Sequence, residues 1–249
     1  MTIGEIITSE NKTVYKITKD IATGDRPNAN VYLCEDSTGK KFIAKHFYKQ
    51  RPMPFLAYAK KNHYGRRRDG SKAVFNEIKD AGKKNEFVVR HVDRIKHKGK
   101  WVIIIDFIDG TTLTDFIWKN RSDKSLLSNA IKALANTLSI WHSNEFAHGD
   151  PHLDNCLIVR DNNNELKVFL IDYSQIHHPT FQYCKRFNCY TPNSEKRMNE
   201  DLINPATNFG RGFKTELSAL SEKLDYGTHL KDVFEENYKR QIATTILNK

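Results

Sequence analysis

Short runs of apolar residues, dominated by β-branched and aromatic side chains, recur through the first 110 residues. Turn-forming residues such as Ser37, Thr38 and Gly39 separate neighbouring runs, which is typical of β-strands. The strands predicted in this way cover residues 13–18, 30–36, 40–47, 87–95 and 101–108. An antiparallel sheet is the simplest assembly of these strands.

One segment among these strands has a helical pattern. In residues 72–82, Val74, Ile78 and Ala81 follow one another at i, i+4 and i+7, and Gly82 stands where a helix would end. The pattern predicts one amphipathic helix inserted between the strands.

The pattern changes near residue 110, after which helical periodicity dominates. It predicts helices over residues 125–144, 215–224 and 228–247, together with one apolar strand over 166–174 that ends in Asp172. We therefore expect an α+β protein in two parts, residues 1–108 rich in strands and residues 111–249 mostly helical.

Composition and charge limit the class of protein. The chain has 249 residues, 39% of them hydrophobic, and a formal net charge of +10, which favours an acidic partner such as a nucleotide, nucleic acid, an anionic membrane or an acidic protein. No apolar run approaches the roughly 20 residues of a membrane span, and the first ten residues do not resemble a secretory signal. We expect a cytoplasmic protein.

The four cysteines are scattered, which favours reduced thiols over a disulfide framework. Cys184 and Cys189, with His177 and His178 nearby, form a possible zinc set, but their spacing is not the usual one.

The stretch from 147 to 159 carries the densest chemistry in the chain. His148, Asp150 and Asn155 form the pattern H-x-D-x-x-x-x-N, and Asp172 follows at the end of the next predicted strand. Phosphoryl transfer to a hydroxyl needs this set of groups. Asp150 would orient the attacking hydroxyl and accept its proton, and Asn155 and Asp172 would supply oxygen ligands for magnesium.

With this motif the sequence resembles the protein-kinase-like superfamily, which implies a two-lobed fold with an N-terminal antiparallel sheet, one helix and a reduced, mainly helical C-terminal lobe. Lys45, in the stretch from Phe42 to Lys45, matches the lysine that neutralises the α- and β-phosphates of ATP. Glu77 matches its ion-pair partner, although a basic and aromatic insertion, residues 51–70, makes the spacing longer than usual. The alternative for Lys45 is a surface lysine at a strand end, and the alternative for Glu77 is an exposed glutamate on a helix.

The resemblance also implies a nucleotide site. Residues 24–31 align with the phosphate-covering loop, with Gly24 and Val31 kept and Arg26 in the place of a glycine. Residues 105–110 match the hinge, where main-chain groups, at Asp106 and Ile108, would bind adenine. ATP and Mg²⁺ are the implied ligands.

Details of the loop separate kinds of kinase. Gly149 stands where eukaryotic protein kinases carry an arginine that reads a loop phosphate, so a phosphorylation switch is not expected. His152 is similar to the histidine of aminoglycoside phosphotransferases and would bind the γ-phosphate or a substrate oxygen; the alternative is a hydrogen-bonded loop histidine. His142 and His148 are expected to brace the loop. Glu216 would anchor it from a helix, or else face solvent.

Only 249 − 172 = 77 residues follow Asp172, so the second lobe would be small. A reduced second lobe resembles that of compact bacterial kinases delivered into host cells as type III effectors, or of kinases of lipopolysaccharide core sugars. The prediction is a serine/threonine protein kinase, cytoplasmic or secreted into a host cell. Its basic surface would favour an acidic protein substrate. The alternatives are a small-molecule or sugar kinase, and a pseudokinase that only binds. Basic and aromatic residues in the insertion also fit RNA, but no RNA-binding motif is present.

Overall fold

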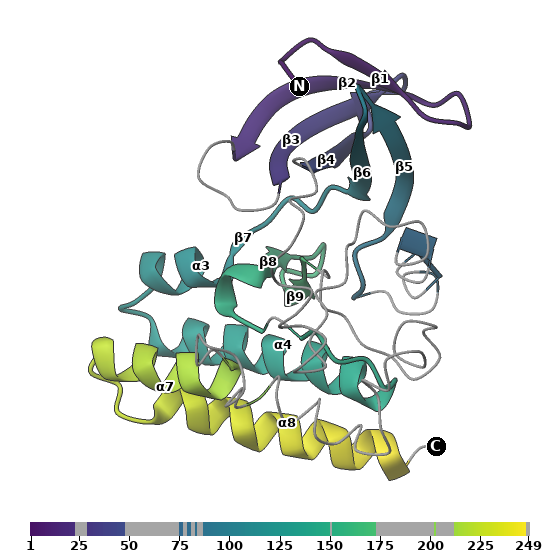
Figure 1. The fold of residues 1–249 in the computed structure, drawn as a ribbon. Helices are drawn as coiled ribbons and strands as arrows, with labels where there is room; N and C mark the ends of the chain where they lie inside the picture. The colour runs from purple at the N-terminus through teal and green to yellow at the C-terminus, as the bar shows by residue number, and fades with distance from the viewer. Residues whose placement is uncertain are drawn as a thin grey trace, which may run out of the picture. The chain divides into compact units, whose positions relative to one another are not determined.

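The computed structural model describes residues 1–22, 29–47, 75–76, 79–80, 83, 87–149, 151–172, 202 and 212–247. These residues form a mixed α+β structure with a six-stranded antiparallel sheet, a three-stranded sheet and four α-helices (Figure 1). The chain divides into two compact units, an N-terminal unit, Met1–Ile108, and a C-terminal unit, Asp109–Lys249.

The N-terminal unit is built on the six-stranded sheet, in which every pairing is antiparallel, as the sequence predicts. In spatial order its strands are β1 (Ile6–Thr8), β2 (Val14–Ala22), β3 (Ala29–Asp36), β4 (Lys41–Phe47), β6 (Lys100–Asp106) and β5 (His91–His97).

Three strands differ most from the prediction, and one of them is β2, which ends at Ala22 instead of residue 18. β5 begins at His91 instead of residue 87, because Phe87, Val88 and Val89 are buried one after another and lack the alternation of a half-buried strand. β1 was not predicted, since it has only three residues and one of its two isoleucines, Ile6, is exposed.

The two edge strands of the sheet, β1 and β5, lie close together. Glu5, next to β1, accepts hydrogen bonds from His97 and Lys98 at the end of β5, and the hydroxyl of Tyr15 donates to Asp93 at 2.5 Å. The sheet therefore curls, and its concave face encloses a core.

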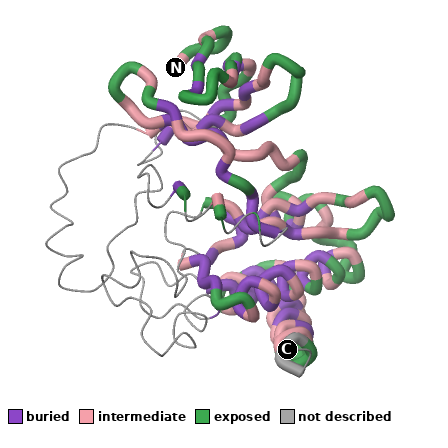
Figure 2. Tube along the Cα trace, turned by 90° about the vertical axis from the view of Figure 1, so that its right-hand side faces the viewer, coloured by how far each residue is buried: buried purple, intermediate pink, exposed green. Residues whose placement is uncertain are grey.

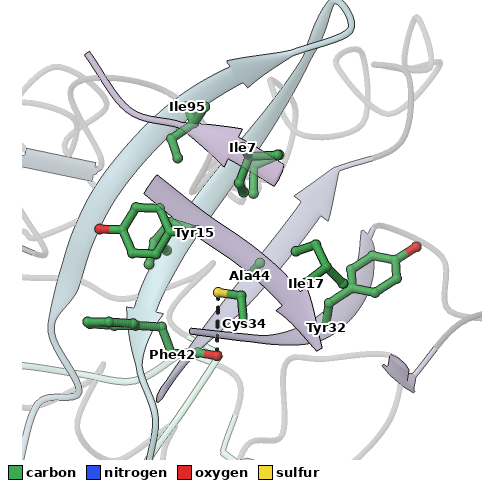
Figure 3. Packing of buried hydrophobic residues seen from close by; sticks show 10 residues of the cluster. Ile7, Tyr15, Ile17, Tyr32, Cys34, Phe42, Ala44 and Ile95 are labelled. Carbon is green, nitrogen blue, oxygen red and sulfur yellow. Dashed lines mark hydrogen bonds between the residues drawn. The ribbon is translucent and has the colours of Figure 1, made fainter. Parts of the chain in front are cut away.

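That core consists of side chains from all six strands (Figure 3). Burial alternates along β4, where Phe42, Ala44 and His46 are buried and Lys45 lies on the opposite face. Figure 2 shows buried, intermediate and exposed positions interspersed along the chain of this unit. The Sγ of Cys34 donates to the carbonyl of Phe42, so this buried thiol acts as a packed, partnered group. The members of the cluster are Ile7, Tyr15, Ile17, Tyr32, Cys34, Phe42, Ala44, Ile95, Val102 and Ile104.

The helix predicted over residues 72–82 lies largely outside the described residues, as do its positions Val74, Ile78 and Ala81. The described residues of that segment, Phe75, Asn76, Lys79 and Asp80, are helical. Phe75 stacks on the ring of His91, and the ammonium of Lys79 donates to the carbonyl of Val92, so these residues pack against β5.

The C-terminal unit contains α3 (Leu113–Lys119), α4 (Lys124–Ser143), α7 (Phe213–Lys223) and α8 (His229–Leu247). The last three confirm the predicted helices within a few residues; the seven-residue α3 was not predicted. Asp123 sets the start of α4, because its carboxylate accepts the N–H of Leu126. α8 packs against both α4 and α7 (Figure 1).

A small antiparallel sheet completes this unit: β7 (Thr111–Thr112), β8 (Cys156–Arg160) and β9 (Leu166–Leu170). β9 ends two residues before Asp172, earlier than predicted. The reason is the backbone of Asp172, whose φ of 62° cannot continue a strand. None of the helices in the described part of the chain is long and apolar enough to cross a membrane.

Candidate active site

The hairpin of β8 and β9 brings the main chain of Asn155 opposite Ile171, the residue before Asp172. Cys156 and Leu170 are the paired residues farthest from the turn of the hairpin, so Asn155 and Ile171 are the next residues beyond this pair. The N–H of Ile171 donates to the carbonyl of Asn155 at 2.8 Å, which extends the pairing by one step. The two predicted magnesium ligands therefore come from adjacent positions at one end of the hairpin.

Ile171 is held a second time, through its carbonyl. Nε2 of His148 lies 2.8 Å from that oxygen, and because a carbonyl only accepts, Nε2 carries the proton. The ring of His148 is fully buried and packs against Trp141 with 5.7 Å between ring centroids. His148 therefore braces the loop, as predicted, and fixes the residue just before Asp172.

Asp172 itself has an uncommon backbone conformation. Its φ of 62° lies in the left-handed region, which Asp tolerates better than most residues, and the residue is exposed. Such strain persists only where neighbouring contacts impose it. The two hydrogen bonds of Ile171 are contacts of this kind, since they fix the residue just before Asp172.

The loop before β8 is anchored by helix α7. Oε2 of Glu216, in the first turn of α7, accepts the N–H of Leu153 at 2.7 Å. Leu153 begins a short 3-10 turn, Leu153–Asn155, and its side chain is buried. This contact confirms the anchoring role predicted for Glu216. Asp150, the proposed catalytic residue, lies outside the described residues.

His152 contributes to the loop through its main chain. Its carbonyl accepts the N–H of Asn155 at 2.9 Å and the thiol of Cys156 at 3.7 Å. The ring is largely buried, and its Nδ1 lies 4.0 Å from the Asp154 carboxylate. These bonds make the main chain of His152 part of the loop, and the contact of its ring with phosphate or substrate stays a prediction.

Cys156, the residue after Asn155, is a poor candidate for a nucleophile. It is fully buried, and that burial raises the pKa of its thiol well above the usual value. The thiol is therefore protonated at neutral pH, which is the form that does not act as a nucleophile.

The described site candidates of the N-terminal unit lie on its sheet. Lys45 stands opposite Val31 on β3 and Ile103 on β6, on the face away from the core cluster. Its ammonium lies 5.6 Å from the ring centroid of Phe47. Gly24 and Glu77, two further residues of the predicted nucleotide site, lie outside the described residues, as does Arg26.

The two residues of the predicted hinge differ in whether their main-chain groups are already hydrogen-bonded. The N–H of Asp106 already donates to the carbonyl of Arg90, and its carboxylate pairs with Nε of Arg90 at 2.6 Å. The hydrogen bond to Arg90 thus leaves Asp106 without a spare N–H. In the described part of the chain, the main-chain groups of Ile108 make no hydrogen bond, so Ile108 is the better candidate for backbone recognition of a base.

The oxygen donors of the loop fit magnesium. The Asn155 amide and the Asp172 carboxylate are hard ligands, and magnesium is usually held by one or two such side chains together with water and phosphate oxygens. Among the described residues, no group of three or more His, Cys, Asp or Glu could hold a metal ion by itself. The zinc set of Cys184, Cys189, His177 and His178 lies outside the described residues.

Two groups that hold this site were missed from the sequence. The main chain of Ile171 carries no side-chain signature, and the hydroxyl of Thr137 donates to the carbonyl of Val168 at 2.8 Å, which ties β9 to α4.

No family model matches the chain, and a search of curated proteins finds no match.

Proposed function

We propose that this protein is an ATP-dependent phosphotransferase with a two-lobed protein-kinase-like fold, which moves the γ-phosphate of ATP to a hydroxyl. The observation that carries the proposal is the main-chain hydrogen bond from Ile171 to Asn155, because it brings Asn155 opposite the residue that precedes the exposed Asp172. The H-x-D-x-x-x-x-N spacing supplies Asp150 in the same loop.

In this proposal each residue has one role. Asp150 orients the acceptor hydroxyl and takes its proton, and Lys45 neutralises phosphate charge with Glu77 as its partner. Asn155 and Asp172 hold magnesium. The metal supplies charge neutralisation on the phosphate oxygens. Gly24, Val31, Asp106 and Ile108 surround the nucleotide in the same scheme.

We propose a protein serine or threonine as the acceptor. Two stretches rich in Lys and Arg, residues 51–70 and 185–197, flank the predicted site residues in sequence and favour an acidic substrate. The protein would act in the cytoplasm or as an effector secreted into a host cell.

One observation favours a second acceptor class. His152, two residues after Asp150, resembles the loop histidine of small-molecule kinases, so a metabolite or a lipopolysaccharide sugar is the alternative substrate. A binding-only pseudokinase is disfavoured because Lys45, Asp150, Asn155 and Asp172 are all present.

The test uses the purified protein, ATP labelled at the γ-phosphate, magnesium and a lysate that contains proteins and small metabolites. Asp150→Ala serves as the inactive control. Label in protein bands that the control lacks supports the protein kinase, and label only in small or glycolipid fractions supports the alternative. If wild type and control give the same labelling in every fraction, the proposal fails.

A further inference from the structure

We propose that Tyr238 of helix α8 is a positioning residue for phosphotransfer, acting through His142 on the loop that carries Asp150. This inference rests on the proposed function and extends it to a residue some 90 positions along the chain from that loop.

The first contact lies between α8 and the end of α4. The hydroxyl of Tyr238 and Nδ1 of His142 share a hydrogen bond of 2.6 Å, and their rings meet edge to face with 5.6 Å between centroids. His142 is 3% exposed, so this bond satisfies a ring nitrogen that is shielded from water. Tyr238 is itself fixed by stacking on Phe234.

The second step leads from His142 into the loop. His142 lies in the last turn of α4, where its carbonyl accepts the N–H of Glu145, and the carbonyl of Trp141 accepts the N–H of Phe146. These bonds set the direction in which the chain leaves the helix. A shift of the His142 side chain would move this turn.

The third step joins the turn to the site. The Trp141 ring packs against both Phe146 and His148, and Nε2 of His148 donates to the carbonyl of Ile171, next to Asp172. The contacts therefore run without interruption from Tyr238 to the residue that presents the proposed magnesium ligand. Catalysis by positioning is sensitive to displacements of about 1 Å.

The discriminating variant is Tyr238→Phe, which removes the hydroxyl and keeps both ring contacts. We expect kcat to fall about tenfold while KM for ATP stays unchanged, since nucleotide binding is retained but alignment is lost. Tyr226→Phe is the matched control, because it removes a hydroxyl that donates to the Arg121 carbonyl in the same unit, away from the loop. It should leave kcat unchanged.

A second readout does not need activity. Hydrogen exchange at the amides of Phe146 and Ile171 should be faster in Tyr238→Phe than in Tyr226→Phe, because both amides belong to the chain of contacts that Tyr238 holds. Unchanged exchange, or an unchanged kcat in an active protein, would overturn the inference. If the wild type has no turnover, the proposed function fails, and exchange alone then decides whether Tyr238 holds the loop.

Discussion

Two residues of the candidate loop depend on backbone conformations that most side chains avoid. Asp172 has a φ of 62°, and Gly149, next to Asp150, has a φ of 78°. Glycine reaches this region without steric cost, so the backbone gives a physical reason for a glycine at position 149. An arginine there would be strained.

Gly149→Ala should lower the free energy of unfolding by about 1 kcal/mol, because a Cβ is strained at this φ. Gly227→Ala is the matched control, since Gly227 also has positive φ and an added Cβ would meet no atom within 4 Å. Urea unfolding should show similar losses for both variants. Only Gly149→Ala should also reduce phosphotransfer, and equal activity of the two variants would contradict the role given to the loop backbone.

His46 is a buried histidine in the N-terminal unit. It is 7% exposed, and neither ring nitrogen has a hydrogen-bond partner among the described residues. Burial, followed by the charge of the N-terminal ammonium, lowers the pKa of His46 to about 4 from 6.5. The unfolded chain therefore binds a proton more readily than the folded one.

Because of this difference, His46 should make stability fall as pH drops from 6.5 towards 4, by at most about 1.4 kcal/mol per pH unit. The effect should fade over about one pH unit above 6.5, where His46 becomes neutral in the unfolded chain as well. His46→Gln removes the titration, so its urea-unfolding free energy should depend less on pH in this window than that of the wild type. Parallel curves for the two proteins would refute the assignment.

At the scale of elements, Gly110 permits the close approach of β7 to β8. A Cβ at this position would lie 2.8 Å from the carbonyl oxygen of Ile158 and 2.7 Å from Cγ1 of Val159. The neighbouring residue pairs, Thr111 with Ile158 and Thr112 with Leu157, join the two strands. Thr112 also caps α3 by accepting the N–H of Asp115.

Gly110→Ala should therefore destabilise the C-terminal unit by about 1–3 kcal/mol, because a main-chain carbonyl cannot move aside as a side chain can. Urea unfolding measures the loss. Adding Val159→Ala should restore only part of it, since the contact with the Ile158 carbonyl remains. Wild-type stability of Gly110→Ala would show that the strands separate at no cost.

Elements with a long, regular pattern were predictable, and short ones were not. The 20 residues of α4 carry enough helical repeats to fix both its type and its ends. β1 and β7, with three and two residues, contain too few positions to show a period. Their pairing depends on partners elsewhere in the chain, which local patterns do not reveal.

At the scale of the whole molecule, the motif residues His148 and Asn155 both bond to the main chain of Ile171, next to Asp172, although strand β8 of the hairpin that brings them there was not predicted. The contacts that hold them were harder to predict. Glu216 bonds to Leu153 across 63 positions of sequence, and Tyr238 bonds to His142 across 96. The sequence suggested only the first, through family resemblance, because a tyrosine on a helix has no local feature that identifies its distant partner.

The most direct test of the account compares magnesium-dependent ATP turnover of the wild type with that of Asp172→Asn and Asp225→Asn. Both aspartates are exposed with positive φ, 62° and 58°, and asparagine tolerates that conformation, so both variants should fold. Asp172→Asn should lose turnover at least about a hundredfold, because it removes the charged oxygen ligand. Asp225→Asn should retain it. Wild-type turnover in Asp172→Asn would contradict the proposed site.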